Sequence, residues 1–356
     1  MDNKNSTFPV LFGALLFCIA VSFIIGGEHI VDVTAVPTVH RDVNNYFLAC
    51  WVDTDGNVWG TFYSFLGKST DKGKTFVRKD APGCYLSGRA VFQDSRGYLY
   101  WSPWGGGSIR RSIDDGDNWC DVHTWTDATK ERGIWGICED LLGCLYAGMY
   151  TTAPTTKFKD DRIFRSTDGG DNWTTVYDGN DRHIHDVACD PYTGYIYATT
   201  GDAAKEIHII RSIDNGDTWE VINSEIRCFA INFLPGMRLF GDDVDGTIYK
   251  TTDDITFTAV YSPSDYLSNF ATAESGGKVF FGQVSHADGN TPQIVSTVDG
   301  DNWEVVHTGT GTDIWDGPSF MSNFGPDGNC YIRMHGNSDD NIRLSDSAAD
   351  EITSDL

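Results

Sequence analysis

The sequence predicts an all-β fold, a seven-bladed β-propeller, and two observations support this prediction. From about His29 onwards, short apolar strands alternate with Gly- and Asp-rich turns, and no helical periodicity appears. One octamer also recurs at intervals of about forty to fifty residues. Its four nearly intact copies are Ser69–Phe76, Ser112–Trp119, Ser166–Trp173 and Ser212–Trp219. Repeats of this length are typical of propellers, in which each repeat forms one small sheet.

Each repeat is expected to form a four-stranded antiparallel blade. In the clearest copy, an inner strand at 184–189 precedes strands at 195–199, 209–212 and 219–222, and the octamer joins the last two. Copies of this unit begin near Tyr46, Arg89, Ile134, Ile184, Cys228, Asn269 and Ser319. This gives seven blades, with six as the alternative. The last copy lacks room for a fourth strand. We expect residues 30–39 to supply it, because closing the ring removes exposed sheet edges.

The octamer pattern Ser/Thr-x-Asp-x-Gly-x-Asn/Thr-Trp/Phe resembles the Asp-box, or BNR repeat, of sialidase-type propellers. Its chemistry is that of a turn, in which the Asp carboxylate accepts backbone N–H bonds, the Gly supplies a positive φ and the Trp packs between sheets. We therefore expect structural roles for Asp71, Asp114, Asp168, Asp214, Trp119, Trp173, Trp219 and Trp303. Two further copies are degraded. Thr251–Phe257 is one residue short and lacks the glycine, and in Ser296–Trp303 the aspartate position holds Val298.

An apolar run without charges, Val10–Ile25, precedes the repeats. It predicts one N-terminal hydrophobic helix, and residues 1–27 are expected to be a membrane anchor or, alternatively, a cleaved signal peptide. The propeller then occupies residues 28–356. Lys4 lies before the run, whereas Glu28 and Asp32 follow it, which favours a propeller outside the cytoplasm. We expect a single-pass membrane protein, or a secreted one if the segment is removed.

Composition excludes some partners. A formal net charge of −25 argues against nucleic acid, whose phosphates require a basic surface. The cysteines form no CxxC pair and no Cys/His cluster with zinc spacing, so we expect no metal site and no cofactor. Cys138 and Cys144 flank a predicted hairpin turn, where they form either a disulfide or two unpaired thiols.

The resemblance to Asp-box propellers implies that ligands bind on the face opposite the octamers. That face consists of the blade-to-blade connections and the loops between second and third strands. Basic residues gather there with acids and tryptophans, and they suit an anionic or sugar-like ligand if they converge. The alternative is solvated loop charges with tryptophans packed between blades. The candidate ligand-binding residues are Arg89, Arg132, Trp135, Arg182, His183, His185, Asp186, Arg227 and Asp316. Loops 101–107 and 148–162 are expected to shape this face.

Two functions are compatible with the resemblance. A sialidase-type hydrolase is expected to carry an early Arg-Ile-Pro motif, but Arg41 is followed by Asp42 and Val43. Other glycosidases place two acids across a cleft, a role that Asp186 and Asp316 are candidates for. A non-catalytic binding or scaffold module for a glycan or protein partner requires no missing motif, as in the similar assembly-factor and sorting-receptor propellers. We favour binding, with a glycoside hydrolase as the alternative.

Overall fold

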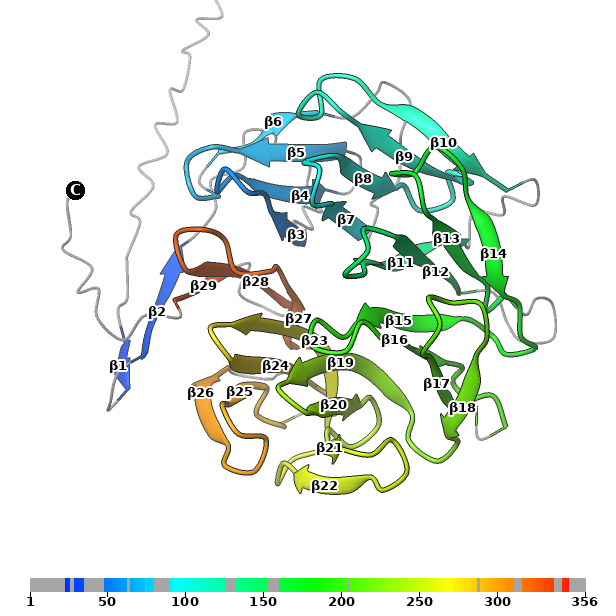
Figure 1. The fold of residues 1–356 in the computed structure, drawn as a ribbon. Helices are drawn as coiled ribbons and strands as arrows, with labels where there is room; N and C mark the ends of the chain where they lie inside the picture. Colours follow the sequence, from blue (N-terminus) through cyan, green and yellow to red (C-terminus); the bar gives the residue numbers. More distant parts are fainter. Residues whose placement is uncertain are drawn as a thin grey trace, which may run out of the picture.

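The computed structural model describes residues 23–25, 29–34, 48–62, 65–73, 75–79, 90–125, 132–152, 160–203, 205–286, 289–309, 316–335 and 341–345. In this part of the chain, antiparallel sheets are arranged around a common axis, with one strand of each sheet innermost (Figure 1). The prediction of an all-β propeller is confirmed. The described residues contain strands and turns but no helix.

Six of the sheets have four strands each. The first three contain β3 (Leu48–Val52), β4 (Val58–Phe62), β5 (Phe65–Ser69) and β6 (Val77–Arg78); β7 (Ala90–Gln93), β8 (Leu99–Ser102), β9 (Ser108–Ser112) and β10 (Cys120–Thr124); and β11 (Arg132–Glu139), β12 (Leu145–Thr151), β13 (Ile163–Ser166) and β14 (Thr174–Tyr177). The next three contain β15 (Ile184–Cys189), β16 (Ile196–Thr200), β17 (His208–Ser212) and β18 (Glu220–Asn223); β19 (Cys228–Leu234), β20 (Met237–Asp242), β21 (Ile248–Thr251) and β22 (Thr258–Tyr261); and β23 (Leu267–Ser275), β24 (Lys278–Ser285), β25 (Gln293–Thr297) and β26 (Glu304–Thr308).

The remaining sheet joins the two ends of the chain. It has five strands in the order β1-β2-β29-β28-β27. These are β1 (Phe23–Ile25), β2 (His29–Thr34), β27 (Gly317–Met321), β28 (Asn329–His335) and β29 (Asn341–Ser345). Strand β2 pairs antiparallel with β29, so the expected closure of the ring by an N-terminal segment is confirmed.

Two details of the predicted fold are corrected. The prediction of seven four-stranded blades is wrong: the described residues form six four-stranded blades, which was the alternative, and the sheet that closes the ring has five strands. The end of the apolar run Val10–Ile25 forms strand β1 rather than the end of a helix, because it pairs with β2. Residues 1–22 lie outside the described residues. Within the described part, no helix has the length and apolar character needed to cross a membrane.

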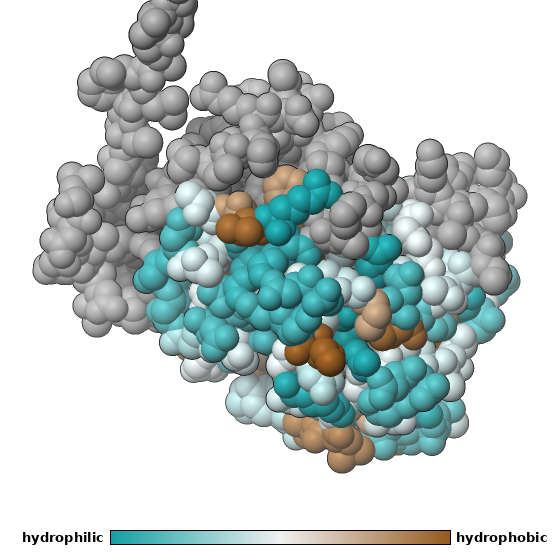
Figure 2. All heavy atoms as spheres, turned by 90° about the horizontal axis from the view of Figure 1, so that it is seen from above, coloured by the Kyte–Doolittle hydropathy of each residue, from teal (hydrophilic) through white to brown (hydrophobic). Residues whose placement is uncertain are grey.

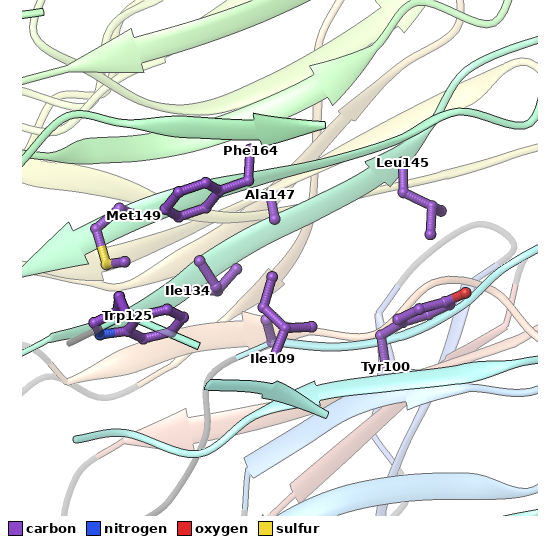
Figure 3. Packing of buried hydrophobic residues seen from close by; sticks show 9 residues of the cluster. Tyr100, Ile109, Trp125, Ile134, Leu145, Ala147, Met149 and Phe164 are labelled. Carbon is purple, nitrogen blue, oxygen red and sulfur yellow. The ribbon is translucent and has the colours of Figure 1, made fainter. Parts of the chain in front are cut away.

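The core lies between neighbouring blades. Tyr100 and Ile109 of one blade pack against Ile134, Leu145 and Phe164 of the next, and all five are at most 2% exposed (Figure 3). Burying one large apolar side chain stabilises a fold by about 1.5–3 kcal/mol, so these interfaces are a main source of stability. The surface is different. On the side shown in Figure 2, hydrophilic residues dominate the described part and hydrophobic residues form small separate patches.

Each intact octamer forms a tight turn between the third and fourth strands of its blade. In Ser166–Trp173, Asp168 accepts bonds from the Asn172 backbone N–H (2.9 Å) and side-chain amide (2.7 Å). The side-chain and backbone bonds from Asn172 lower the pKa of Asp168. Gly170 has a φ of 82°, and its N–H donates to the Ser166 hydroxyl. Corresponding bonds to carboxylate oxygens occur at Asp71, Asp114 and Asp214.

The two degraded copies build the same turn with one residue fewer. Asp253 accepts the Thr256 N–H at 2.8 Å, and Asp299 accepts the Asn302 N–H at the same distance. Asp299 also bonds the hydroxyl of Thr297, which replaces the first serine. The interpretation that Val298 occupies the aspartate position is therefore wrong. The turn begins one residue later, and its carboxylate is that of Asp299.

The octamers also connect neighbouring blades. Arg111 and Tyr100 both donate to the carbonyl oxygen of Gly169 in the next blade's octamer, the tyrosine at 2.8 Å. Arg165 and Tyr146 repeat this contact with the carbonyl oxygen of Asn215, at 2.5 and 2.8 Å. These bonds connect two of the octamer turns to the blade that precedes each of them in the sequence.

The cysteine alternatives are resolved. Cys138 and Cys144 are both free thiols, as are Cys120, Cys189, Cys228 and Cys330. The possible disulfide across the hairpin is therefore absent. Burial raises the pKa of the Cys138 thiol, which makes it a poor nucleophile.

Candidate functional site

The two faces of the ring carry different connections. In an antiparallel four-stranded blade, consecutive connections alternate between opposite ends of the sheet. The octamers therefore share one face with the turns between first and second strands. The loops between second and third strands share the other face with the blade-to-blade connections. The inner strands begin at this second face, and the candidate site lies there.

One-residue bulges in the inner strands build the site. The pairing register skips one residue in β11, β15, β19 and β23. The skipped residues are Trp135, His185, Phe229 and Phe270. Because a bulge leaves its extra residue unpaired and bends the strand, it can re-aim that side chain. All four side chains line one pocket between the inner strands.

This pocket has a volume of about 160 Å³, and five of its ten lining residues are aromatic. The Phe229 ring stacks on Phe270 with centroids 4.4 Å apart and meets Trp135 edge-on at 5.4 Å. Phe320 lies 6.3 Å from Trp135. Trp104, from the loop expected to shape this face, meets Trp135 edge-on at 6.5 Å. The other lining residues are His185, Asp186, Ala230, Ala271, Thr272 and Met321.

Two buried histidines meet a carboxylate at the edge of this pocket. His183 Nδ1 is 2.6 Å from the carbonyl oxygen of Thr151, and His185 Nδ1 is 3.0 Å from that of Cys228. Their Nε2 atoms face Asp202, at 3.5 Å from Oδ2 for His183 and 3.0 Å from Oδ1 for His185. The three side chains come from the start of β15 and the loop after β16.

Two arginines flank this cluster, and each is paired with a carboxylate. Arg182 donates to Oδ2 of Asp202, and Arg227 donates to Asp243. Arg227 also bonds the carbonyl oxygen of Asp202 at 3.2 Å. The positive charges are thus compensated within the protein, which makes this rim less suited to binding an anion than unpaired arginines would be.

Burial controls the ionisation of the site. It raises the pKa of Asp186 to about 7, although the Ile231 N–H donates to this carboxyl. It lowers the pKa of His183 to about 4, so that ring is neutral at physiological pH. Burial also opposes ionisation of Asp202, but the two histidines outweigh it and lower the pKa of Asp202.

The structure brings six of the nine candidate ligand-binding residues together. These are Trp135, Arg182, His183, His185, Asp186 and Arg227. Asp316 is buried just before β27 and does not line the pocket. Arg132 begins β11, but its side chain lies outside the described residues, as does all of Arg89.

Sequence reasoning missed the lining residues Ala230, Ala271, Thr272 and Met321, and it also missed four residues that dominate the site. They are Asp202, Phe229, Phe270 and Phe320. The sequence did carry a signal for Phe229 and Phe270. Each is the second residue of its repeat unit, the same position that Trp135 and His185 occupy in theirs. Asp202 follows a glycine after the second strand, and no motif marks it.

Asp242, at the end of β20, gives a prediction for pH dependence. Burial raises its pKa to about 6, so the folded chain holds a proton that the unfolded chain releases at lower pH. This contribution to stability is present below the unfolded pKa and is lost as pH rises through about 6. Between about pH 5 and pH 8, the free energy of unfolding of wild type should fall by about 1 kcal/mol relative to that of Asp242→Asn.

Urea denaturation of both proteins at the two pH values measures this difference. Asparagine retains the oxygen that accepts the Val244 N–H at 2.6 Å, so the loop is conserved in the variant. If the free energy of unfolding changed with pH by the same amount in both proteins, Asp242 would not titrate in this range.

Comparisons with known proteins agree on the fold. No protein-family model and no curated protein matches the sequence. Among solved structures, virginiamycin B lyase from Staphylococcus aureus has a TM-score of 0.64 at 15% identity, over 89% of this chain and 99% of that one. The extracellular domain of a one-component system from B. thetaiotaomicron has a TM-score of 0.61 at 12% identity, and the match covers 88% of this chain and 39% of that one. YCF48 from Cyanidioschyzon merolae has a TM-score of 0.57 at 14% identity, and the match covers 85% of this chain and 97% of that one. At such identities the likeness shows the β-propeller fold alone.

Proposed function

We propose that this chain is a non-catalytic binding module, an Asp-box propeller displayed outside the cytoplasm that receives an apolar group of a partner protein in its central pocket. The observation that carries the proposal is the pocket itself, with walls of Trp135, Phe229, Phe270 and Phe320. Concave, mainly apolar sites with a few polar groups at the edge are typical of ligand recognition. The octamer turns support membership in the Asp-box family, and the charges around the apolar run support export.

The size of the pocket favours a protein partner over a glycan. Sites for free small molecules usually occupy about 300–1,000 Å³. This pocket, at about 160 Å³, takes one compact group rather than a whole sugar chain. Aromatic anchors buried in such pockets dominate protein interfaces, and a surrounding polar rim is their usual setting. The paired arginines Arg182 and Arg227 supply that rim.

Glycoside hydrolysis is supported less well. A two-acid mechanism requires carboxyl groups that flank the scissile bond. Asp186 lines the pocket, whereas Asp316 is 2% exposed and is not part of its wall. The sialidase-type Arg-Ile-Pro motif is also missing after Arg41. For these reasons we place hydrolysis second.

The proposal predicts that small apolar amides bind the full chain at the pocket. N-acetylated phenylalanine and leucine amides serve as probes, with binding followed by ligand-observed NMR. Trp135→Ala removes a wall that contacts Phe229 and Phe320, and it should weaken binding by roughly 10-fold or more. Tyr192→Ala is the matched control, because Tyr192 is 44% exposed in the turn after β15, on the opposite face.

Other outcomes would overturn the proposal. Binding of a glycan panel in place of the amides would identify a lectin-like site. Cleavage of a fluorogenic sialoside at an ordinary enzymatic rate would establish hydrolysis. Equal binding by wild type and Trp135→Ala would place the ligand elsewhere.

A further inference from the structure

We propose that His183, His185 and Asp202 form a binding site for a divalent transition metal, of which Zn²⁺ is the best fit. No motif in the sequence predicted a metal here. The inference goes beyond the binding function above and does not depend on it. It rests on the orientation of the two rings, on their burial and on the spacing of the three side chains.

Hydrogen bonds fix the orientation of both rings. A carbonyl oxygen only accepts, so the Nδ1 atoms of His183 and His185 must carry the protons that they share with Thr151 and Cys228. In the absence of a metal, His185 Nε2 also donates to Oδ1 of Asp202 at 3.0 Å, and a metal ion would take the place of that proton. A neutral ring presents the lone pair of Nε2 on the side opposite Nδ1. Donation of the second ring nitrogen to a backbone carbonyl is the usual arrangement for a metal-binding histidine.

The lone pairs converge on a third acceptor. Both Nε2 atoms face the carboxylate of Asp202, and the three candidate ligand atoms lie within 4.8 Å of one another. His183 is 0% exposed, and its Nε2 has no hydrogen-bond partner among the described residues. A buried acceptor without a donor is destabilising. A cation between the three atoms would remove this destabilisation.

The two Nε2 atoms that face Asp202 could each bind a proton or could share one metal ion, and the metal ion is the more favourable arrangement. Protonation of both rings would place two imidazolium ions side by side, with ring centroids 4.7 Å apart. Both rings are at most 1% exposed, and Arg182 already supplies a positive charge to Asp202. A single divalent ion bound to neutral rings satisfies both Nε2 atoms without this repulsion.

The spacing and the chemistry of the ligands fit zinc. Tetrahedral coordination with bonds of about 2.0–2.1 Å places ligand atoms roughly 3.3 Å apart. His185 Nε2 is 3.0 Å from Oδ1 of Asp202 and His183 Nε2 is 3.5 Å from Oδ2, whereas the whole set of ligand atoms spans up to 4.8 Å, so the side chains would draw closer together around the ion. Imidazole and carboxylate ligands suit zinc and its neighbours in the first transition row. Arg182 holds the carboxylate in place through Oδ2, as a supporting residue commonly does.

Three protein ligands leave the fourth position of a tetrahedral ion open. His185 also lines the aromatic pocket, so the open position lies beside it. A water molecule or a donor atom of the pocket's occupant would complete the coordination. The metal would thereby link the two parts of the site.

Metal binding by the full chain tests this inference directly. After treatment with a chelator and dialysis against micromolar Zn²⁺, wild type should retain one zinc per chain by elemental analysis. Co²⁺ in its place should give the strong visible absorption of a tetrahedral site. Asp202→Asn and His185→Gln each change a proposed ligand, so each should weaken zinc binding by more than the roughly 10- to 100-fold typical of losing a residue that only supports a ligand.

A matched control is His208→Gln, which changes a histidine of the same blade that pairs with Asp181 instead. It should bind zinc as wild type does. Urea denaturation of each variant without metal establishes that it folds, and added Zn²⁺ should raise the midpoint of wild type but not of Asp202→Asn. Failure of folded wild type to retain zinc, or equal retention by all variants, would overturn the assignment.

Discussion

Gly201→Ala is expected to destabilise the folded chain by about 2–4 kcal/mol, because two costs add at this position. Gly201 has a φ of 67°, a conformation that side chains disfavour. A Cβ would also lie 1.9 Å from the backbone carbonyl oxygen of Glu206, which is far inside van der Waals contact. The loop after β16 must therefore open. That movement displaces the adjacent Asp202 from its histidines.

Urea denaturation of wild type and variant measures the loss. Gly236→Ala is the matched control, since Gly236 has a φ of 77° but a Cβ there would meet nothing within 4 Å, and it should cost only about 1 kcal/mol. Zinc retention should fall in Gly201→Ala and persist in the control. Equal stability of the two variants would mean that the loop relaxes around the new methyl group.

The fold could be predicted from the sequence because its determinants are local and repeated. Asp168, Gly170 and Asn172 bond within one turn, so their spacing is visible in the sequence. Strand 184–189 was predicted with its observed bounds. The fifth strand of the closing sheet was not predicted, because strand β1 is set by pairing with β2 and its apolar residues equally suit a helix.

The site was only partly predictable because its geometry is not local. His183 and His185 stand two residues apart, but His183 precedes β15 and His185 is the bulge residue of that strand, so strand alternation alone does not bring the two side chains together. Their meeting with Asp202 depends on a loop seventeen or more residues later in the chain. The aromatic pocket depends on bulges that re-aim Trp135 and Phe229, and a bulge has no reliable sequence signal.

The octamer has a second role that its sequence does not reveal. The carbonyl oxygen of Asn215 accepts bonds from two residues of the preceding blade, Tyr146 and Arg165. The turn thus presents a backbone acceptor to a neighbour as well as closing its own hairpin. Rigid blade interfaces of this kind hold the inner strands in place, and the pocket is built from those strands.

Tyr146→Ala is therefore expected to cost about 3–5 kcal/mol, the second large effect that we predict. The side chain is 0% exposed and packs in the interface with Ile184 and Ile196. Its hydroxyl lies 2.8 Å from the carbonyl oxygen of Asn215 and 3.0 Å from Oδ2 of Asp140. Truncation removes the packing and leaves both acceptors without this donor, and the free energy of unfolding from urea denaturation measures the total.

Tyr146→Phe separates these two contributions. It retains the ring and removes the hydroxyl, so it should cost only about 1–2 kcal/mol. Leu142→Ala in the same hairpin is the control, because Leu142 is 71% exposed and its truncation should change stability by less than about 0.5 kcal/mol. If Tyr146→Phe were as stable as wild type, the hydroxyl would contribute nothing and packing alone would join these blades. If Tyr146→Phe instead lost as much stability as Tyr146→Ala, the hydrogen bond to the octamer carbonyl oxygen would be the main connection between these blades.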